Sequence, residues 1–397
     1  MYWHAMALAH SRYILDGFDN EPSGCEVLAI APVDSASTAS IFKVGPRSEA
    51  PLRKAKFVQV NTYRVRDTWC RLSEWLKHIR SFQPDIIVVL DEAASANALL
   101  AGVVNGLLGR GVVLFYGFEN IVQYPGWRDF LRRPTLRGGW NCIRRTARFA
   151  ILDWMLMPLR RRLIHGGLVS YQECADVIKA MGFDPPMSQQ WWAVNDNTFV
   201  PDGPKAEFGL GDRYVFGFVG RFTAEKGILD LVRALAALGE EYALVLVGDG
   251  PLAAAIRSLA DELRVADRIR LLPPQDQTQL AASYRAMNLV VLPSHGASTW
   301  KEQYGRVLME AMQCGVAVAG SGSGAIPAVL QDPAAVFPEG DVGAIVAVIE
   351  HLRANPPRAE DLRRRCAGTG AEDFASAWIR LGRDILLTTA RRRQAAE

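Results

Sequence analysis

Short apolar runs alternate with longer helical patterns along most of the chain, and this rhythm constrains the fold more than any other feature. Runs such as DIIVVL (85–90) and YALVLVG (242–248) have the length and continuous apolar character of strands buried on both faces. The stretches between such runs carry apolar residues at helical spacing, and 68–80 is one example. This β-α-β-α order predicts an α/β protein with doubly wound parallel sheets covered by helices.

The rhythm breaks once, between residues 185 and 213, where prolines and glycines occur without a helical or strand period. We interpret this stretch as a linker and expect a domain boundary near residue 200. A chain of 397 residues has about the length of two ordinary domains. Two doubly wound domains joined here would present a cleft to the carboxyl ends of both sheets, where such folds bind ligands.

Composition excludes several classes of protein. The net charge of +3 argues against a dedicated nucleic-acid binder, which usually carries a large basic excess. The six cysteines form no CxxC pair, so we expect reduced thiols in a cytoplasmic protein. The first twenty residues do not have the pattern of a signal peptide, and no run of about 18 apolar residues predicts a membrane-spanning helix.

The stretch GFVGRFTAEKGILDLVRAL (217–235) predicts a strand, a short loop and a helix. The strand ends at Gly220, the loop carries Arg221 and Lys226, and the helix begins near Gly227. Cations and a helix N-terminus both favour anions, so the loop is a candidate diphosphate site. The alternative is that a glycine and a few surface charges follow a strand with no ligand involved.

A second candidate follows the strand that ends near residue 293, where a loop leads into a helix beginning near Gly305. The amides of Arg306 and Val307 are expected to point at a phosphate. Glu302 and Glu310 flank this helix start, with seven residues between them, and a carboxylate beside a phosphate is repelled. Carboxylates accept hydrogen bonds from hydroxyls, and eight helical residues would rise about 12 Å. The pair therefore predicts a nucleotide sugar, with ribose and hexose on either side of a diphosphate. The alternative is that Glu310 is an ordinary helical acid and Glu302 an ordinary loop acid.

The order of these motifs resembles a known family. GRFTAEKG is followed by VGDGPL (247–252), PS (293–294), the Glu302–Glu310 stretch with EAMQCG, and GSGSGAIP (320–327). This order is similar to the donor-binding domain of retaining glycosyltransferases of family 4, which have the two-domain GT-B fold. The resemblance is specific over about 215–330 and weaker over the N-terminal half. It implies an N-terminal acceptor domain (1–198), a C-terminal donor domain (199–373) and a return helix (374–397) that packs on the N-terminal domain.

The resemblance also implies a role for each candidate residue on the donor side. Arg221 and Lys226 would hold the diphosphate, Glu302 the transferred sugar and Glu310 the ribose. Gly220 and the backbone from Gly305 to Val307 would cradle phosphate and hexose. The expected donor is a nucleoside-diphosphate sugar, most commonly a UDP-sugar, with no cofactor. No Asp-x-Asp occurs, so we expect no metal, and the resemblance implies transfer with retention by front-face attack.

The acceptor side departs from the family pattern. Members often have a glycine-rich loop after the first strand, where this chain has His4, and a histidine after a later strand, where it has Glu119 and Asn120. We name these three residues as acceptor-side candidates. Residues 121–165 contain ten arginines and three tryptophans, which fits either a segment on an anionic membrane surface or a solvated helix.

Those two readings of 121–165 lead to different acceptors. A membrane-bound segment would favour a lipid-linked acceptor in polysaccharide or glycolipid assembly, with the protein at the inner face of the plasma membrane. A solvated segment leaves a soluble small molecule, such as a secondary metabolite, equally open.

Three further alternatives remain at this point. The first is a GT-B epimerase or phosphorylase, and the second is a non-catalytic protein that binds nucleotide sugars. The third is a nicotinamide-dependent oxidoreductase, because GSGSGA (320–325) matches G-x-G-x-x-A and Glu339 follows at the spacing of a ribose-binding acid. That motif normally opens its domain, whereas here four predicted strands precede it.

Overall fold

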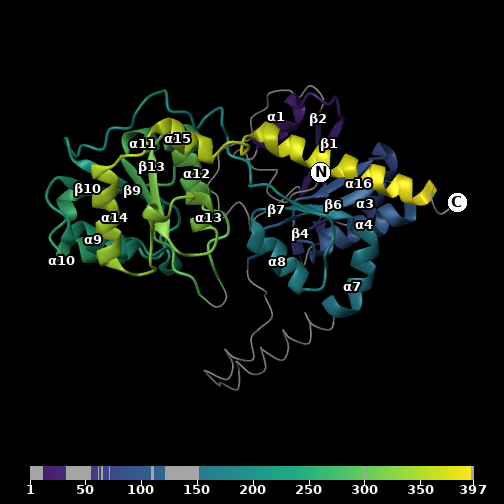
Figure 1. Cartoon of the computed structure of the whole chain (residues 1–397), viewed down its shortest axis with the longest axis horizontal. Helices are drawn as coiled ribbons and strands as arrows, with labels where there is room; N and C mark the ends of the chain where they lie inside the picture. The colour runs from purple at the N-terminus through teal and green to yellow at the C-terminus, as the bar shows by residue number, and fades with distance from the viewer. Residues whose placement is uncertain are drawn as a thin grey trace, which may run out of the picture. The chain divides into compact units, whose positions relative to one another are not determined.

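The computed structural model describes residues 12–32, 55–60, 62–63, 66–70, 72–108, 111–120, 152–297 and 300–394. The chain divides into two compact units (Figure 1). Unit 1 comprises the residues up to Trp191 together with those from Ala371 onward, and unit 2 comprises Trp192–Gly370. The sequence predicts these changes of domain slightly later, after residues 198 and 373.

Unit 1 holds two groups of parallel strands and a small antiparallel pair. Its elements are α1 (Arg12–Asn20), β1 (Val27–Pro32), β2 (Ala55–Val60), β3 (Thr62–Tyr63), β4 (Arg66–Cys70), α3 (Leu72–Phe82), β5 (Ile86–Val89), α4 (Ala96–Leu108), β6 (Val112–Gly117), α7 (Leu152–Leu163), β7 (Gly166–Val169), α8 (Gln172–Ala180), β8 (Met187–Gln189) and α16 (Ala371–Gln394). A parallel sheet is formed by β5, β6, β7 and β8 in that order. β1 and β2 form a separate parallel pair, and β3 and β4 form an antiparallel pair. The expected helix over 68–80 is wrong at its start, because Trp69 lies in β4 and the helix begins at Leu72.

The C-terminal helix α16 belongs to unit 1. It packs against α1 and contacts β6 and β7, and Figure 1 shows it in yellow beside α1. Its side chains Phe374 and Trp378 are buried and lie within 6.1 Å of the ring of Tyr116 on β6, measured between ring centroids. The last helix of the chain therefore completes the core of the first unit.

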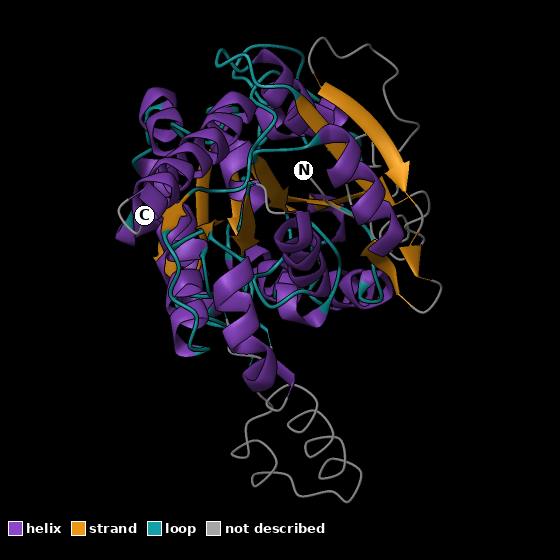
Figure 2. Cartoon of the chain, turned by 90° about the vertical axis from the view of Figure 1, so that its right-hand side faces the viewer, coloured by secondary structure: helices purple, strands orange, loops and turns teal. Residues whose placement is uncertain are grey.

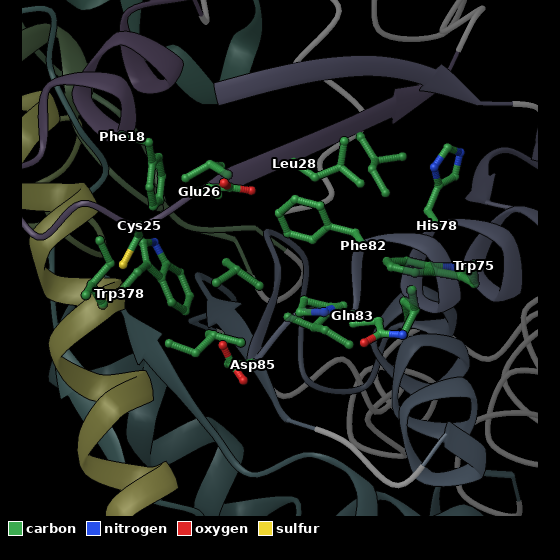
Figure 3. Close-up of a pocket in the computed structure, with 18 residues that line it drawn as sticks. Phe18, Cys25, Glu26, Leu28, Trp75, His78, Phe82, Gln83, Asp85 and Trp378 are labelled. Carbon is green, nitrogen blue, oxygen red and sulfur yellow. The ribbon is translucent and has the colours of Figure 1, made fainter. Parts of the chain in front are cut away.

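A cavity of about 310 Å³ lies in unit 1 between β1, α3, β5 and α16. Figure 3 shows aromatic side chains around it, among them Phe18, Phe82 and Trp378. Among the described residues, none of the donor-site candidates lines this cavity, and neither does Glu119 or Asn120.

Unit 2 contains one six-stranded parallel sheet with helices packed beside its strands (Figure 1). Figure 2 distinguishes the described helices from the strands of the chain by colour. Its elements are β9 (Tyr214–Val219), α9 (Ile228–Ala237), β10 (Tyr242–Val247), α10 (Ala253–Glu262), β11 (Ile269–Leu272), α11 (Gln277–Ala286), β12 (Leu289–Leu292), α12 (Arg306–Gln313), β13 (Ala317–Ser321), α13 (Ile326–Leu330), β14 (Val336–Phe337), α14 (Val342–Ala354) and α15 (Ala359–Arg365). β10 is buried along its whole length, and α9 buries Ile228, Leu231 and Leu235 at helical spacing.

The strand order of unit 2 is β11-β10-β9-β12-β13-β14. The chain therefore moves outward from β9 to β11 on one side, returns to the centre, and continues from β12 to β14 on the other. This is the order of the Rossmann fold, in which ligands bind where the direction reverses, at the carboxyl ends of the two central strands. In unit 2 these strands are β9 and β12, which pair through Leu289 with Phe216 and Val290 with Gly217.

Gly227 fixes the distance between the segments that follow these two strands. It lies between a short 3₁₀ turn (Ala224–Lys226) and α9, with a left-handed φ of 63°. A Cβ atom at this position would collide with the carbonyl oxygen of Pro293, which follows β12. Only glycine allows both this backbone conformation and this close approach.

A partly buried acid, Glu92, lies after the carboxyl end of β5 in unit 1. Oε1 of Glu92 accepts hydrogen bonds from the backbone N–H groups of Phe118 and Glu119, both at 2.7 Å, so it fastens the segment after β6. Burial raises the pKa of Glu92 from 4.5 to about 8, against the opposing effect of these two hydrogen bonds. The nearby charges of Glu119 and Asp91 raise this pKa further.

We predict that Gly227→Ala destabilises unit 2 more than Gly209→Ala does. Gly209 has the same φ of 63°, but a Cβ atom added there would meet no other atom within 4 Å, so it reports the backbone strain alone. We expect a loss of about 1 kcal/mol in the free energy of unfolding at Gly209 and about 2–4 kcal/mol at Gly227. Urea unfolding of both variants measures the difference, and equal losses would contradict the close approach to Pro293.

We predict that the protein loses stability relative to Glu92→Gln as the pH rises from about 4.5 to about 8. In this interval the unfolded carboxyl is ionised while the folded one keeps its proton, so folding takes up a proton. The free energy of unfolding should fall by at most about 1.4 kcal/mol per pH unit. Thermal unfolding at pH 5, 6, 7 and 8 measures it, with Glu173→Gln on the exposed surface of α8 as the control. Parallel pH profiles for wild type and Glu92→Gln would contradict the assignment.

Candidate functional site

The candidate site of unit 2 lies where β9 and β12 end. Gly220 directly follows β9 and has a φ of 151°, a conformation that side chains rarely adopt. Pro293 and Ser294 directly follow β12, and the hydroxyl of the buried Ser321 at the end of β13 donates to the carbonyl of Ser294. The switch in strand order thus brings together the two segments that the sequence indicated separately.

The first segment carries the two predicted cations. The guanidinium of Arg221 is largely exposed and lies 3.8 Å from the carboxylate of Glu225. Lys226 ends the 3₁₀ turn, and its backbone N–H donates to the carbonyl of Thr223. The backbone N–H of His295, after β12, donates to the carbonyl of Glu225, so the two segments are hydrogen-bonded to each other.

Lys226 and Glu302 form a direct ion pair. Nζ of Lys226 lies 2.6 Å from Oε2 of Glu302, and the two side chains are 18% and 12% exposed. The same carboxylate oxygen accepts a hydrogen bond of 2.8 Å from Oγ of Ser294. The backbone of Glu302 is also fixed, because its carbonyl accepts a hydrogen bond from the N–H of Ala325.

Trp300 covers the ammonium group of Lys226. The centre of its indole ring lies 4.9 Å from Nζ, which is within the range of a cation–π interaction. Two hydrogen bonds between Ala297 and Trp300 shape this segment, and the N–H of Gly296 donates to the carboxylate of Glu339. Lys226 therefore has a carboxylate and an aromatic ring as neighbours.

Helix α12 begins directly after this loop. Its N-cap is Gly305 in the left-handed conformation with a φ of 56°, and Arg306 and Val307 are its first residues. Glycine has no side chain to accept from the amides of the first turn, and the third of these amides, that of Leu308, donates to the carbonyl of Gly305. This is the helix start that the sequence predicted near Gly305.

Glu310 lies in the second turn of α12 and is buried, with 5% of its surface exposed. Its Oε1 lies 3.1 Å from Nε of Arg306, and its Oε2 accepts a hydrogen bond of 2.9 Å from the hydroxyl of Tyr284. Burial raises the pKa of Glu310, while Arg306 and Tyr284 oppose the shift. Each carboxylate oxygen can accept a further hydrogen bond from a ligand.

Several residues at this edge were not identified from the sequence as part of a site. Ser294 could have been identified from the sequence, because a polar residue directly after a buried strand lies at the carboxyl edge of the sheet. Tyr284 could not have been identified in this way, because it lies on α11 and contacts Glu310 only through the tertiary fold. His295, in the segment after β12, makes a structural contact, with Nε2 2.7 Å from Oδ2 of Asp230 on α9.

The acceptor-side candidates Glu119 and Asn120 lie in unit 1, directly after β6. The backbone of Glu119 is held by Glu92, and the side-chain amide of Asn120 donates to the hydroxyl of Tyr171 at 2.6 Å. Tyr171 in turn stacks on Trp191 with ring centroids 5.6 Å apart. The third candidate, His4, lies outside the described residues.

The arginine-rich stretch 121–165 is described only from residue 152 onward. Two arginines of α7 are used within unit 1: Arg160 is buried and donates to the carbonyl of Ala94, and Arg161 donates to that of Gly182. In the described part of the chain, no helix combines the length and apolar character needed to cross a membrane. The same residues contain no cluster of three or more His, Cys, Asp or Glu side chains that could hold a metal ion.

Sequence comparison matches part of this chain, whereas structural comparison matches almost all of it. Residues 204–370 match the family model described as glycosyl transferases group 1. The D-inositol 3-phosphate glycosyltransferase of Mycolicibacterium smegmatis is 34% identical over 178 residues, which cover 42% of this chain and 39% of that protein. The chain thus spans about two fifths of the length of the curated relatives it matches.

Solved structures match over almost the whole chain. HepE of Anabaena, crystallised with UDP, has a TM-score of 0.60 at 13% identity and covers 96% of both chains. The lipopolysaccharide outer core galactosyltransferase WaaB has a TM-score of 0.59 at 16% identity and covers 92% of both. The chain therefore has the GT-B fold, as expected from the sequence, and its residues 204–370 are those that resemble glycosyl transferases group 1.

Proposed function

We propose that this protein is a glycosyltransferase that moves a sugar from a nucleoside-diphosphate sugar to a hydroxyl acceptor. The observation that carries the proposal is the pairing of Lys226 with Glu302 at the strand-order switch of unit 2, beside the N-terminus of α12. A cation, a helix start and a hydroxyl-accepting carboxylate at one sheet edge match the diphosphate and the sugar of such a donor. The match of residues 204–370 to glycosyl transferases group 1 supports the same activity.

Each residue has a role in this proposal. Arg221, Lys226 and the amides of the first turn of α12 stabilise the charge that develops on the departing diphosphate. Glu302 accepts hydrogen bonds from the transferred sugar. Gly220 and the backbone from Gly305 to Val307 leave room for the diphosphate and sugar. Glu310 accepts from the ribose. A UDP-sugar is the proposed donor, which is supported by the solved GT-B structures that hold UDP.

We further propose the retaining, metal-independent chemistry of family 4. The bond between the anomeric carbon and the phosphate oxygen breaks, and the acceptor oxygen bonds to the same face of that carbon. The acceptor proton passes to an oxygen of the departing diphosphate. Cationic side chains and helix amides supply the electrostatic stabilisation that a metal ion would otherwise provide.

The acceptor is proposed to bind unit 1, with His4, Glu119 and Asn120 as candidates. A lipid-linked or polysaccharide acceptor, with peripheral membrane binding through 121–165 at the cytoplasmic face, agrees with the activity named for WaaB. The relatives that act on D-inositol 3-phosphate favour a small soluble acceptor instead. Epimerisation, or nucleotide-sugar binding without reaction, remains as an alternative on the same fold. Product analysis with labelled donor distinguishes transfer, epimerisation and the absence of a reaction, and co-sedimentation with anionic liposomes tests membrane binding.

We predict that UDP, among UDP, GDP, ADP and dTDP, raises the melting temperature of the wild-type protein. Glu310→Gln should weaken this binding at least about tenfold, because a neutral amide accepts more weakly from two ribose hydroxyls. Thermal shift and calorimetry measure both effects. Tyr284→Phe is the matched control, since it removes one neighbour of Glu310 and keeps the carboxylate. Binding of none of the four nucleotides would contradict the proposed function.

We also predict that the product keeps the anomeric configuration of the donor and that EDTA does not slow the reaction. Water serves as the acceptor until the natural one is known, and proton NMR of the first sugar released distinguishes the two anomers. An inverted product would rule out the retaining mechanism. A rate abolished by EDTA and restored by Mg²⁺ would rule out metal independence.

A further inference from the structure

Each of the three cationic side chains named for the donor site is paired with an acid. Arg221 lies beside Glu225, Lys226 beside Glu302 and Arg306 beside Glu310, at 3.8, 2.6 and 3.1 Å. Two other acids nearby have partners as well: Asp230 contacts Arg233 and His295, and Glu339 accepts from the N–H of Gly296. Lys301, in the loop between β12 and α12, is exposed. The site is thus close to neutral, although a nucleoside diphosphate is strongly anionic.

Glu302 is held so that it cannot turn away when an anion binds Lys226. Its carbonyl is fixed by the N–H of Ala325, and its carboxylate accepts from Ser294, a residue with no exposed surface. Lys226 is fixed in turn by the bond from its N–H to Thr223 and by the indole ring of Trp300. Both side chains of the pair are mostly buried, so solvent screens their charges less than on the surface.

A donor and its product place different groups beside this carboxylate. A nucleotide sugar carries two negative charges on its diphosphate, and its sugar presents hydroxyls that donate hydrogen bonds to Glu302. The product diphosphate lacks the sugar, and its terminal phosphate gains about one further negative charge near pH 7. The fixed carboxylate therefore attracts the sugar hydroxyls of the donor and repels the additional charge of the product diphosphate.

On the basis of the proposed donor site, we propose that Glu302 selects the nucleotide sugar over the sugar-free nucleoside diphosphate and so promotes product release. Glu302 thereby acts on specificity through its charge as well as by accepting sugar hydroxyls. The counter-intuitive consequence is that removal of this carboxylate strengthens binding of the product.

The test compares dissociation constants for UDP and UDP-glucose by calorimetry in wild type and Glu302→Gln. In the variant we expect UDP to bind about three- to tenfold more tightly, the size of one charge interaction at about 5 Å in a partly exposed site. UDP-glucose should bind equally or more weakly. Glu241→Gln is the matched control, because it removes one acidic charge from the opposite edge of the same sheet, before β10. It should change neither constant by more than about twofold.

A second measurement needs no variant. UDP whose terminal phosphate carries a methyl ester has the charge of the donor and no sugar, so the wild-type protein should bind this ester more tightly than UDP. Tighter binding of UDP than of the ester would overturn the proposal. So would unchanged or weaker binding of UDP to Glu302→Gln. If wild type binds neither UDP nor any other nucleotide, the proposed function itself fails, which is a different outcome.

Discussion

The pairing of β9 with β12 is the contact on which the candidate site depends. These strands are separated in sequence by β10 and β11, and they pair through only two residue pairs, Phe216 with Leu289 and Gly217 with Val290. A Cβ atom at Gly217 would meet the sulfur and the terminal methyl group of Met287, which would have to move aside. Because the strands are parallel, their carboxyl ends lie at the same edge, and Lys226 can meet Glu302 across 76 residues of chain.

Electrostatic balance at this edge has a physical reason. Cations gathered for a diphosphate would repel one another in a ligand-free protein, and partly buried charges without partners are costly. Pairing each of them with an acid removes that cost and fixes the side chains in place before a ligand arrives. In the proposed donor site, the acids favour a ligand that brings hydroxyl groups, because an anion that binds the cations leaves these acids without their partners.

Much of unit 2 could be predicted from the sequence, and less of unit 1. The strand that ends before Gly220 and the helix that starts after Gly305 follow from local patterns, because a glycine marks each of these ends. That the two segments meet depends on the pairing of β9 with β12, which no local pattern records. The Tyr284 and Arg306 contacts of Glu310 depend on the packing of α11 against α12, which no local pattern records. In unit 1 the helix expected over 68–80 began too early, since Trp69 fits a strand as well as a helix face. Glu92 was missed because its partners are backbone amides, which every residue but proline has.

The two units also differ in which comparison matches them: unit 2 matches in sequence and in fold, and unit 1 in fold. The family match ends at residue 370, where unit 2 ends, whereas the fold match extends over almost the whole chain. The residues of the proposed donor site all lie within the matched range 204–370. Unit 1 lies outside that range, and its core includes the aromatic contacts of α16 with Tyr116. The proposed acceptor-side residues Glu119 and Asn120 lie outside the residues that match the family model, in the segment after β6 whose backbone Glu92 holds.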